Sequence, residues 1–175
     1  MQKSAQYRAA YLRHLWAALT GKSMESYETS FTGKILERGF WLYVWRISSG
    51  EETVWYVGRT GDNSSANAAS PFGHLSQHLD LRPSAQANML AKNLRNSGMI
   101  PGECEYNLLT LGPLFPEQSD FEDHKPYRDI VGKLEAELAY TLSQRGLLVL
   151  GTHPKRGDFD KTLFTEVLSK VNAFT

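Results

Sequence analysis

The chain has 175 residues, 41% of them hydrophobic, and its 19 basic and 19 acidic side chains give a formal net charge of zero. This length suits one domain with room for an additional arm or helix, and 8 Phe, 8 Tyr and 4 Trp residues suffice to fill a core. A single cysteine, Cys104, excludes an internal disulfide framework and favours a reducing, cytoplasmic compartment. No apolar run approaches the roughly 20 residues needed to span a membrane, so we expect no membrane partner.

The zero net charge restricts how the chain can bind nucleic acid. Proteins that wrap nucleic acid are usually strongly basic, because phosphate neutralisation supplies most of the non-specific affinity. Any basic surface must therefore be local, and residues 1–24 contain Lys3, Arg8, Arg13 and Lys22 but no acidic residue. Two interpretations stay open for this segment: a nucleic-acid contact through Lys3, Arg8 and Arg13, or the solvated face of a helix.

The first predicted element in chain order is a helix over residues 5–19, whose apolar residues recur at helical spacing and which ends at Gly21. A polar connection follows over residues 22–33. We therefore expect residues 1–38 to form an N-terminal helix and connecting arm, and residues 39–175 to form the main domain.

Three strands are predicted in the main domain. Residues 40–47 are nearly all apolar, aromatic and β-branched, which indicates a strand buried on both faces. A turn at residues 48–50 leads into a second strand over residues 53–57, so a hairpin is predicted. The small polar stretch over residues 61–71 is typical of an exposed loop. Residues 103–111 form the third predicted strand.

The remaining segments predict helices. Short helices are expected over residues 72–79 and 85–95, and longer ones over 127–144 and 159–174. A loop rich in proline and acidic residues is expected over 112–126. The order of elements predicts an α+β domain with a small three-stranded antiparallel sheet flanked by helices, with extra N- and C-terminal helices.

Common cofactor motifs do not explain the chain. No phosphate-binding loop, dinucleotide fingerprint or Cys pair is present. His74 and His78 place two imidazoles on one helical face, but zinc is disfavoured because no glutamate directly follows His74 and no Cys pair accompanies them.

Two tyrosines occupy the predicted hairpin at a suggestive spacing. Leu42-Tyr43 lies in the first strand and Tyr56-Val57-Gly58 ends the second. Taken alone, the tyrosines are better explained by core packing. Read with the following helices, however, their order and spacing over residues 39–151 resemble the paired motifs of the GIY-YIG nuclease family.

The resemblance implies a metal-dependent endonuclease that hydrolyses phosphodiester bonds. It implies two tyrosines on neighbouring strands, here Tyr43 and Tyr56, and a following helix with an arginine and, one turn later, a histidine. His78 matches that histidine, whereas His74 stands where arginine is expected. Arginine offers a permanent planar charge that a largely neutral imidazole lacks. Arg59 and Arg82 are the candidates for supplying the missing charge.

The resemblance also implies a glutamate on a later helix that holds one divalent cation, Mg²⁺ or Mn²⁺. Helical geometry favours Glu135, which lies roughly 60° from the centre of the apolar stripe, over Glu137, which lies nearer 100° on the other side. The alternative for Glu135 is a solvated flank position paired with Lys133 or Arg128. An asparagine expected after this helix is absent, and Gly151 stands near its place.

The roles that follow from the resemblance are specific. Tyr43 orients or deprotonates a water, which requires a nearby cation to lower the phenol pKa from about 10. Tyr56 contacts the phosphate or the water, and His78 and the weaker His74 position phosphate oxygens. The expected partner is nucleic acid, DNA in the first place, and cutting both strands favours a homodimer. Two alternatives stay open: a catalytically inactive module of this fold that binds nucleic acid or protein, and an unrelated α+β domain.

Overall fold

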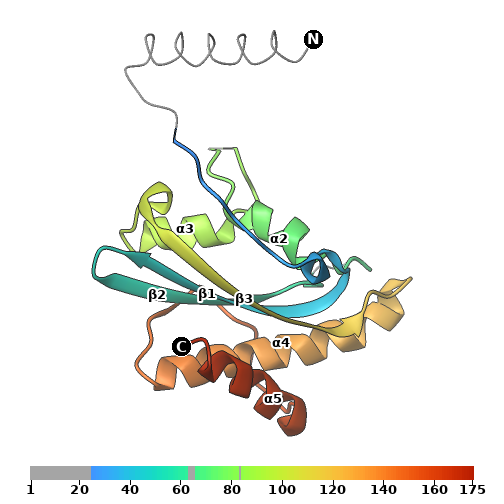
Figure 1. Ribbon diagram of the computed structural model, residues 1–175. Helices are drawn as coiled ribbons and strands as arrows, with labels where there is room; N and C mark the ends of the chain where they lie inside the picture. The colour runs from blue at the N-terminus through green and yellow to red at the C-terminus, as the bar shows by residue number, and fades with distance from the viewer. Residues whose placement is uncertain (1–24, 63–65, 83) are drawn as a thin grey trace, which may run out of the picture. The chain divides into compact units, whose positions relative to one another are not determined.

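The structure of the chain, a computed structural model, describes residues 25–62, 66–82 and 84–175 (Figure 1). The predicted helix over residues 5–19 lies outside the described residues, as do Lys3, Arg8 and Arg13. By its contacts the chain divides into two units, Met1–Thr32 and Gly33–Thr175, and the whole sheet belongs to the second. Residues 25–32 are exposed and without regular structure.

The second unit contains one four-stranded sheet in the order β3-β1-β2-β4. The strands are β1 (Gly39–Ser49), β2 (Glu52–Arg59), β3 (Glu105–Pro116) and β4 (Val149–Leu150). β1 pairs antiparallel with β2 and β3, which confirms the hairpin and the third strand, whereas β4 pairs parallel with β2. The sheet is therefore mixed and not purely antiparallel with three strands as predicted. A two-residue strand is too short to show the alternation by which strands are recognised.

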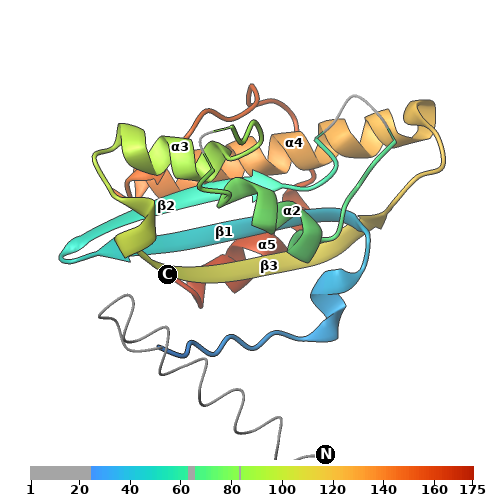
Figure 2. The ribbon, with the colours of Figure 1, turned by 90° about the horizontal axis from the view of Figure 1, so that it is seen from above.

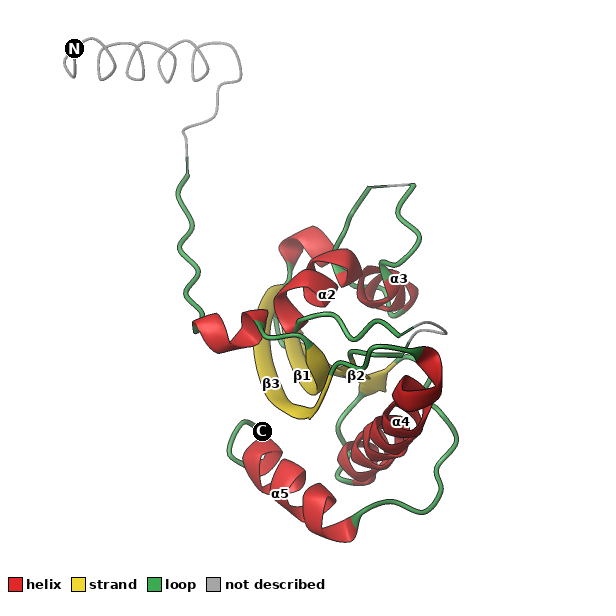
Figure 3. Cartoon of the chain, turned by 90° about the vertical axis from the view of Figure 1, so that its right-hand side faces the viewer, coloured by secondary structure: helices red, strands yellow, loops and turns green. Residues whose placement is uncertain are grey.

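Helices cover both faces of this sheet. α2 (Pro71–His78) and α3 (Met89–Asn96) lie on one face, and α4 (Phe121–Gln144) and α5 (Lys161–Asn172) lie on the other (Figures 1 and 3). Seen from above, α2 and α3 lie over β3, β1 and β2 (Figure 2). Two short 3₁₀ helices, Gly33–Leu36 and Pro101–Glu103, complete the unit. In the described part of the chain, no helix is both long enough and apolar enough to cross a membrane.

The predicted loop over residues 112–126 is largely wrong. β3 continues to Pro116, and α4 begins at Phe121 after the N-cap residue Asp120, whose side chain accepts a hydrogen bond from the Asp123 amide. Such a cap satisfies an otherwise unpaired amide of the first turn. Pro126 lies inside the helix, so reading it as a boundary placed the start of the helix too late. The helix predicted over 85–95 shows the opposite error, because it begins later than predicted, at Met89.

Alternation along β1 divides its side chains between two hydrophobic cores. Phe40, Leu42 and Val44 pack towards α4 and α5, and Tyr43 and Trp45 pack towards α2 and α3. This confirms the prediction of a strand buried on both faces. Full burial of an aliphatic or aromatic side chain contributes about 1.5–3 kcal/mol each.

The buried stripe of α4 determines which way the helix faces. Val131, Leu134, Leu138 and Leu142 are fully buried against the sheet, as their spacing predicts. Ile130, counted with them in the sequence, is 37% exposed, so the stripe is narrower than expected.

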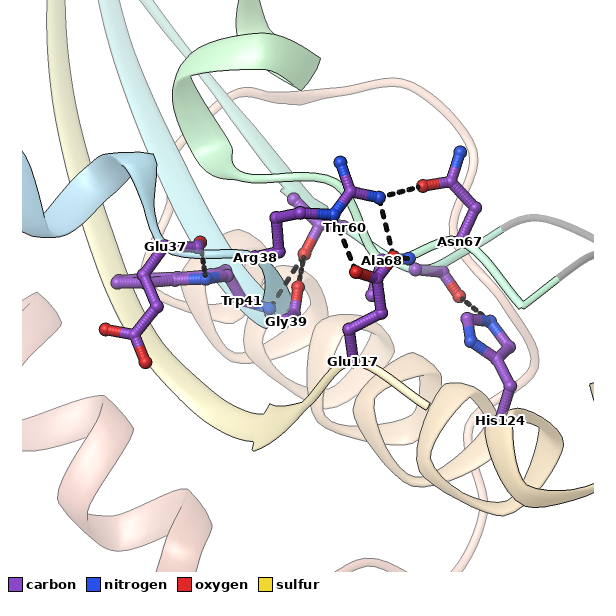
Figure 4. A network of polar contacts seen from close by, with 10 residues as sticks. Glu37, Arg38, Gly39, Trp41, Thr60, Asn67, Ala68, Glu117 and His124 are labelled. Carbon is purple, nitrogen blue, oxygen red and sulfur yellow. Dashed lines mark hydrogen bonds and ion pairs between the residues drawn. The ribbon is translucent and has the colours of Figure 1, made fainter. Parts of the chain in front are cut away.

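An ion pair holds the segment before α2 against the end of β3. Arg38 contacts both carboxylate oxygens of Glu117 at 2.6 Å, and its Nη2 also donates to Asn67 (Figure 4). Glu117 Oε1 accepts a further hydrogen bond from the amide of Ala68 at 3.0 Å. This network fixes the chain shortly before it enters α2.

A second set of bonds fixes the chain where it leaves β2. The Thr60 hydroxyl donates to the Gly39 carbonyl at 2.6 Å and accepts from the Trp41 amide at 2.9 Å. The buried imidazole of His124 on α4 donates from Nε2 to the Gly61 carbonyl at 3.0 Å (Figure 4). The end of β2 is thereby held in place relative to both β1 and α4.

Candidate active site

A cleft of about 410 Å³ opens beside the end of β2. β4 pairs only with Trp55 and Tyr56 of β2, so residues 57–59 of β2 extend past the end of β4. The cleft is lined by residues of β1, β2, α2, α4 and the segments around them: Tyr43, Tyr56, Gly58, Arg59, Asp62, His78, Met89, Glu135, Thr152, His153 and Pro154. Five of the residues selected from the sequence, Tyr43, Tyr56, Arg59, His78 and Glu135, therefore meet in one place.

The ring of Tyr43 lies directly over Gly58, its cross-strand partner. A Cβ at position 58 would stand 2.5 Å from three atoms of the Tyr43 ring end, well inside van der Waals contact. Tyr43 is 1% exposed, and its Oη shares a hydrogen bond of 2.8 Å with His78 Nε2. Gly58, the last but one residue of β2, is thus needed for the tyrosine of β1 to reach the histidine of α2.

Two histidines of α2 accompany the tyrosines. The helix starts where Ser70 accepts a hydrogen bond from the Gly73 amide and where Pro71 occupies the first turn. The rings of His74 and His78, one turn apart, have centroids 4.8 Å from each other. The His74 ring lies 6.0 Å from that of Tyr43, but His74 does not line the cleft.

Burial sets the protonation of these four side chains. Burial raises the pKa of Tyr43 well above its usual value, and it raises the pKa of Tyr56 with a smaller contribution from Glu135. Burial also lowers the pKa of His74, and burial together with neighbouring His74 lowers the pKa of His78 to about 4. At neutral pH both phenols are therefore protonated and both imidazoles are neutral. This environment favours Tyr43 as a group that orients a water over one that deprotonates it.

Glu135 projects from α4 between two basic side chains. It is 8% exposed, and its Oε2 lies 2.8 Å from Arg59 Nε, while its Oε1 lies 3.4 Å from His153 Nδ1. Glu137 instead forms an ion pair of 2.7 Å with Arg156 and does not line the cleft. The choice of Glu135 from helical geometry thus selects the glutamate that faces the cleft.

The alternative interpretation of Glu135 as a solvated flank residue does not match its surroundings. Among the described residues its ionic partners are Arg59 and His153, and neither Lys133 nor Arg128 contacts its carboxylate. The Arg128 side chain pairs with Asp129.

The structure separates the two arginines proposed to replace the missing charge. Arg59 lines the cleft, and its Nη1 donates to the backbone carbonyl of Arg128. Arg82 is exposed, forms an ion pair with Asp80 and does not line the cleft. Arg59 therefore remains a candidate, and Arg82 is not part of this site.

Sequence reasoning missed two titratable residues of the cleft, Asp62 and His153, of which His153 contacts Glu135. Gly151, which stands near the place of the expected asparagine, has φ +94°, and a Cβ there would lie 3.1 Å from the Tyr56 ring. Any larger residue would be strained at this position. His153, two residues further on, donates from Nδ1 to Glu135, and its Nε2 is buried without a hydrogen-bond partner among the described residues. No periodic pattern marks this histidine in the sequence.

The donor set of the cleft suits a divalent cation that keeps most of its waters. Within the described ranges, no group of three or more His, Cys, Asp or Glu side chains is arranged to hold a metal ion. Mg²⁺, however, is commonly bound by one or two carboxylates and several waters. Each oxygen of Glu135 has a further lone pair beyond its contact to Arg59 or His153. The residues therefore fit a cation held by Glu135 and water, without a protein cage.

Comparison with known proteins assigns no family to the chain. No family model matches it, and searches of curated proteins and of solved structures found no significant match. The resemblance to GIY-YIG nucleases stays a prediction from its motifs.

Proposed function

We propose that this protein is an endonuclease of the GIY-YIG type and that the cleft beside β2 is its active site. The observation that carries the proposal is the convergence in one cleft of Tyr43, Tyr56, His78, Arg59 and Glu135, which come from three different parts of the chain. The proposed substrate is nucleic acid, DNA in the first place, and cutting both strands calls for two copies of the chain.

Glu135 is the residue that would hold Mg²⁺ or Mn²⁺. Such a cation acts as a Lewis acid on a phosphoryl oxygen. Arg59 and His153 contact the two oxygens of Glu135 and so keep its carboxylate directed at the cleft. Side chains that hold a ligand from behind in this way commonly tune its affinity for a metal.

The tyrosines and His78 act as neutral hydrogen-bonding groups. Because Tyr43 and Tyr56 keep their protons at neutral pH, each phenol donates a hydrogen bond to a water or to a phosphate oxygen. In this arrangement His78 donates from Nε2 to the Tyr43 hydroxyl, which fixes its position and leaves the one phenol proton for the water or phosphate. Removing one donor that acts in the transition state typically reduces the rate by about 10²–10³.

A second candidate is a module of the same fold that binds nucleic acid or a protein partner without cleaving. Two observations favour it. A neutral His74 stands where the resemblance expects a charged arginine, and both oxygens of Glu135 already contact basic side chains. Lys3, Arg8 and Arg13 are then the predicted nucleic-acid contacts.

The deciding experiment is a cleavage assay on supercoiled plasmid with Mg²⁺ or Mn²⁺ at one stated salt concentration. Glu135→Gln is compared with Glu137→Gln. Glu137 lies on the same helix and is also paired with an arginine, Arg156, but it does not line the cleft. We expect the wild type and Glu137→Gln to nick or linearise the plasmid and Glu135→Gln to bind without cutting. Binding in a gel shift with no cleavage by any of the three proteins would favour the non-catalytic module, and neither binding nor cleavage would refute both.

A further inference from the structure

The guanidinium of Arg59 lies against one face of α4. It contacts that helix at Arg128 and Glu135, and it lies over Gly132 between them. These positions are spaced i, i+4 and i+7, which places them on one side of an α-helix. Nη1 donates to the Arg128 carbonyl, and Nε lies 2.8 Å from Glu135 Oε2. The guanidinium is thus held at two points along α4.

Gly132 provides the space for this arrangement. A Cβ at position 132 would stand 3.1 Å from Nη1, 3.2 Å from Cζ and 3.4 Å from Nη2 of Arg59. Gly132 is buried inside a 24-residue helix and has no positive φ, so the backbone there does not require glycine. Glycine in a helix interior is less favourable than alanine. Glycine at position 132 is therefore explained by the guanidinium of Arg59, which occupies the space that a Cβ would need.

One nitrogen of the guanidinium, Nη2, has no contact partner of its own. Within the part of the chain that the structure describes, Nη1 donates to the Arg128 carbonyl, buried Nε approaches Glu135 in the ion pair without a hydrogen bond, and Nη2 makes no hydrogen bond. The Arg59 side chain is 13% exposed and lines the cleft. Arginine stays charged at all working pH values and donates in a fixed plane, which suits phosphate oxygens.

We propose that Arg59 binds a phosphate oxygen of the substrate through Nη2, and that Gly132 is the positioning residue that lets its guanidinium lie flat on α4. This inference rests on the proposed endonuclease function and adds a phosphate contact to it. It also explains how the cleft supplies a permanent positive charge although His74 is neutral.

The first test uses binding of a fluorescently labelled DNA duplex by the full chain, in EDTA, at several salt concentrations. Arg59→Gln is compared with Arg145→Gln, which removes an exposed arginine at the end of the same helix. We expect Arg59→Gln to weaken binding roughly ten- to a hundredfold, the effect of losing a charged hydrogen bond. The slope of log Kd against log salt should fall by about one, which a merely structural role would not change. Equal slopes for the two variants would overturn the phosphate contact.

The second test is a double-mutant cycle of Gly132→Ala with Arg59→Lys. With Arg59 present, we expect Gly132→Ala to weaken DNA binding and plasmid cleavage by about tenfold or more, because the guanidinium must move. With Lys at position 59 the same change should have less than about a twofold effect, since an ammonium has no planar group to displace. Equal losses in both backgrounds, or no loss in either, would overturn the role of Gly132.

Two controls keep the tests interpretable. The melting temperature of Gly132→Ala should stay within about 4 °C of the wild type, because the better helix propensity of alanine, about 1 kcal/mol, offsets the cost of moving the Arg59 guanidinium. A large decrease in the melting temperature would mean that the space at position 132 serves folding, and it would overturn the proposed role of Gly132. The comparison of Arg59→Gln with Arg145→Gln would then still test the phosphate contact. Failure of the wild type itself to bind or cleave DNA would refute the endonuclease function, a result distinct from a wild type that cleaves but tolerates Gly132→Ala.

Discussion

Replacing Gly58 by alanine should displace the Tyr43 ring and destabilise the fold. The added Cβ would lie 2.5 Å from Cε2, Cζ and Oη of Tyr43, whereas non-bonded carbons rest about 3.5–4.0 Å apart. The ring must therefore move by about 1 Å. Because Tyr43 is buried and its Oη lies 2.8 Å from His78 Nε2, such a movement can lengthen this contact to about 3.8 Å, beyond hydrogen-bond range.

The size of the effect follows from three contributions. Losing a buried hydrogen bond costs about 1–3 kcal/mol, and overfilling the core costs about 1–3 kcal/mol. The reduced entropy of the unfolded chain returns about 0.4–1 kcal/mol. We therefore expect Gly58→Ala to lower the free energy of unfolding by about 1–6 kcal/mol, with plasmid cleavage lost in parallel.

Urea unfolding followed by tryptophan fluorescence measures this difference. Gly102→Ala is the matched control, because no atom lies within 4 Å of a Cβ at that position, and its effect should stay within about 0.5 kcal/mol. Tyr43→Phe removes the hydroxyl without the overlap and should cost only the hydrogen bond, about 1–3 kcal/mol. An unfolding free energy for Gly58→Ala equal to that of the control would refute the close approach of Tyr43 to Gly58.

Three further predictions concern charge and protonation. Burial holds the pKa of His78 at about 4, below its usual 6.5, so as the pH is lowered the unfolded chain is protonated at this histidine before the folded chain is. The free energy of unfolding should therefore fall by up to about 3 kcal/mol as the pH is lowered from 6.5 to 4, and His78→Gln should flatten this slope in urea titrations. Burial raises the pKa of Tyr43, so this residue contributes no phenolate absorbance near pH 10 while the protein is folded. Tyr43→Phe should therefore leave that absorbance unchanged in the folded protein but reduce it in urea, where the tyrosine of the wild type ionises. Glu117→Ala should lower the free energy of unfolding by about 1–2 kcal/mol in thermal melts, more than Arg38→Ala, because Glu117 also accepts from the Ala68 amide whereas Arg38 is half exposed.

Local patterns in the sequence identify the β1–β2 hairpin and place Glu135 beside the buried face of α4. The apolar run of β1 and the turn after it predict the hairpin, and helical spacing places Glu135 on the border of the stripe formed by Leu134 and Leu138. These features succeed because each depends on neighbours within two turns of a helix or within one strand pair.

Features that depend on contacts between distant segments were not predictable in the same way. His153 reaches Glu135 across 18 residues of chain, through a segment with no periodicity. The position of Arg59 depends on Gly132, and a lone glycine in a helical pattern indicates only a weak helix position. Pro126 suggests a helix boundary, but Asp120 already caps the helix six residues earlier. Burial of the apolar side of α4 outweighs the cost of a proline inside the helix.

α4 contributes Glu135 to the cleft from a single helix about 36 Å long, at 1.5 Å per residue over its 24 residues. The Arg128 carbonyl and Glu135 both belong to this helix and lie two turns apart, so a shift of the helix moves them together. Tyr43 belongs to the sheet and packs on the face away from α4. The distance between Glu135 and Tyr43 is therefore set by the core layer between α4 and the sheet, where Leu134 is buried, and a change of side-chain volume in that layer would change this distance without touching either residue.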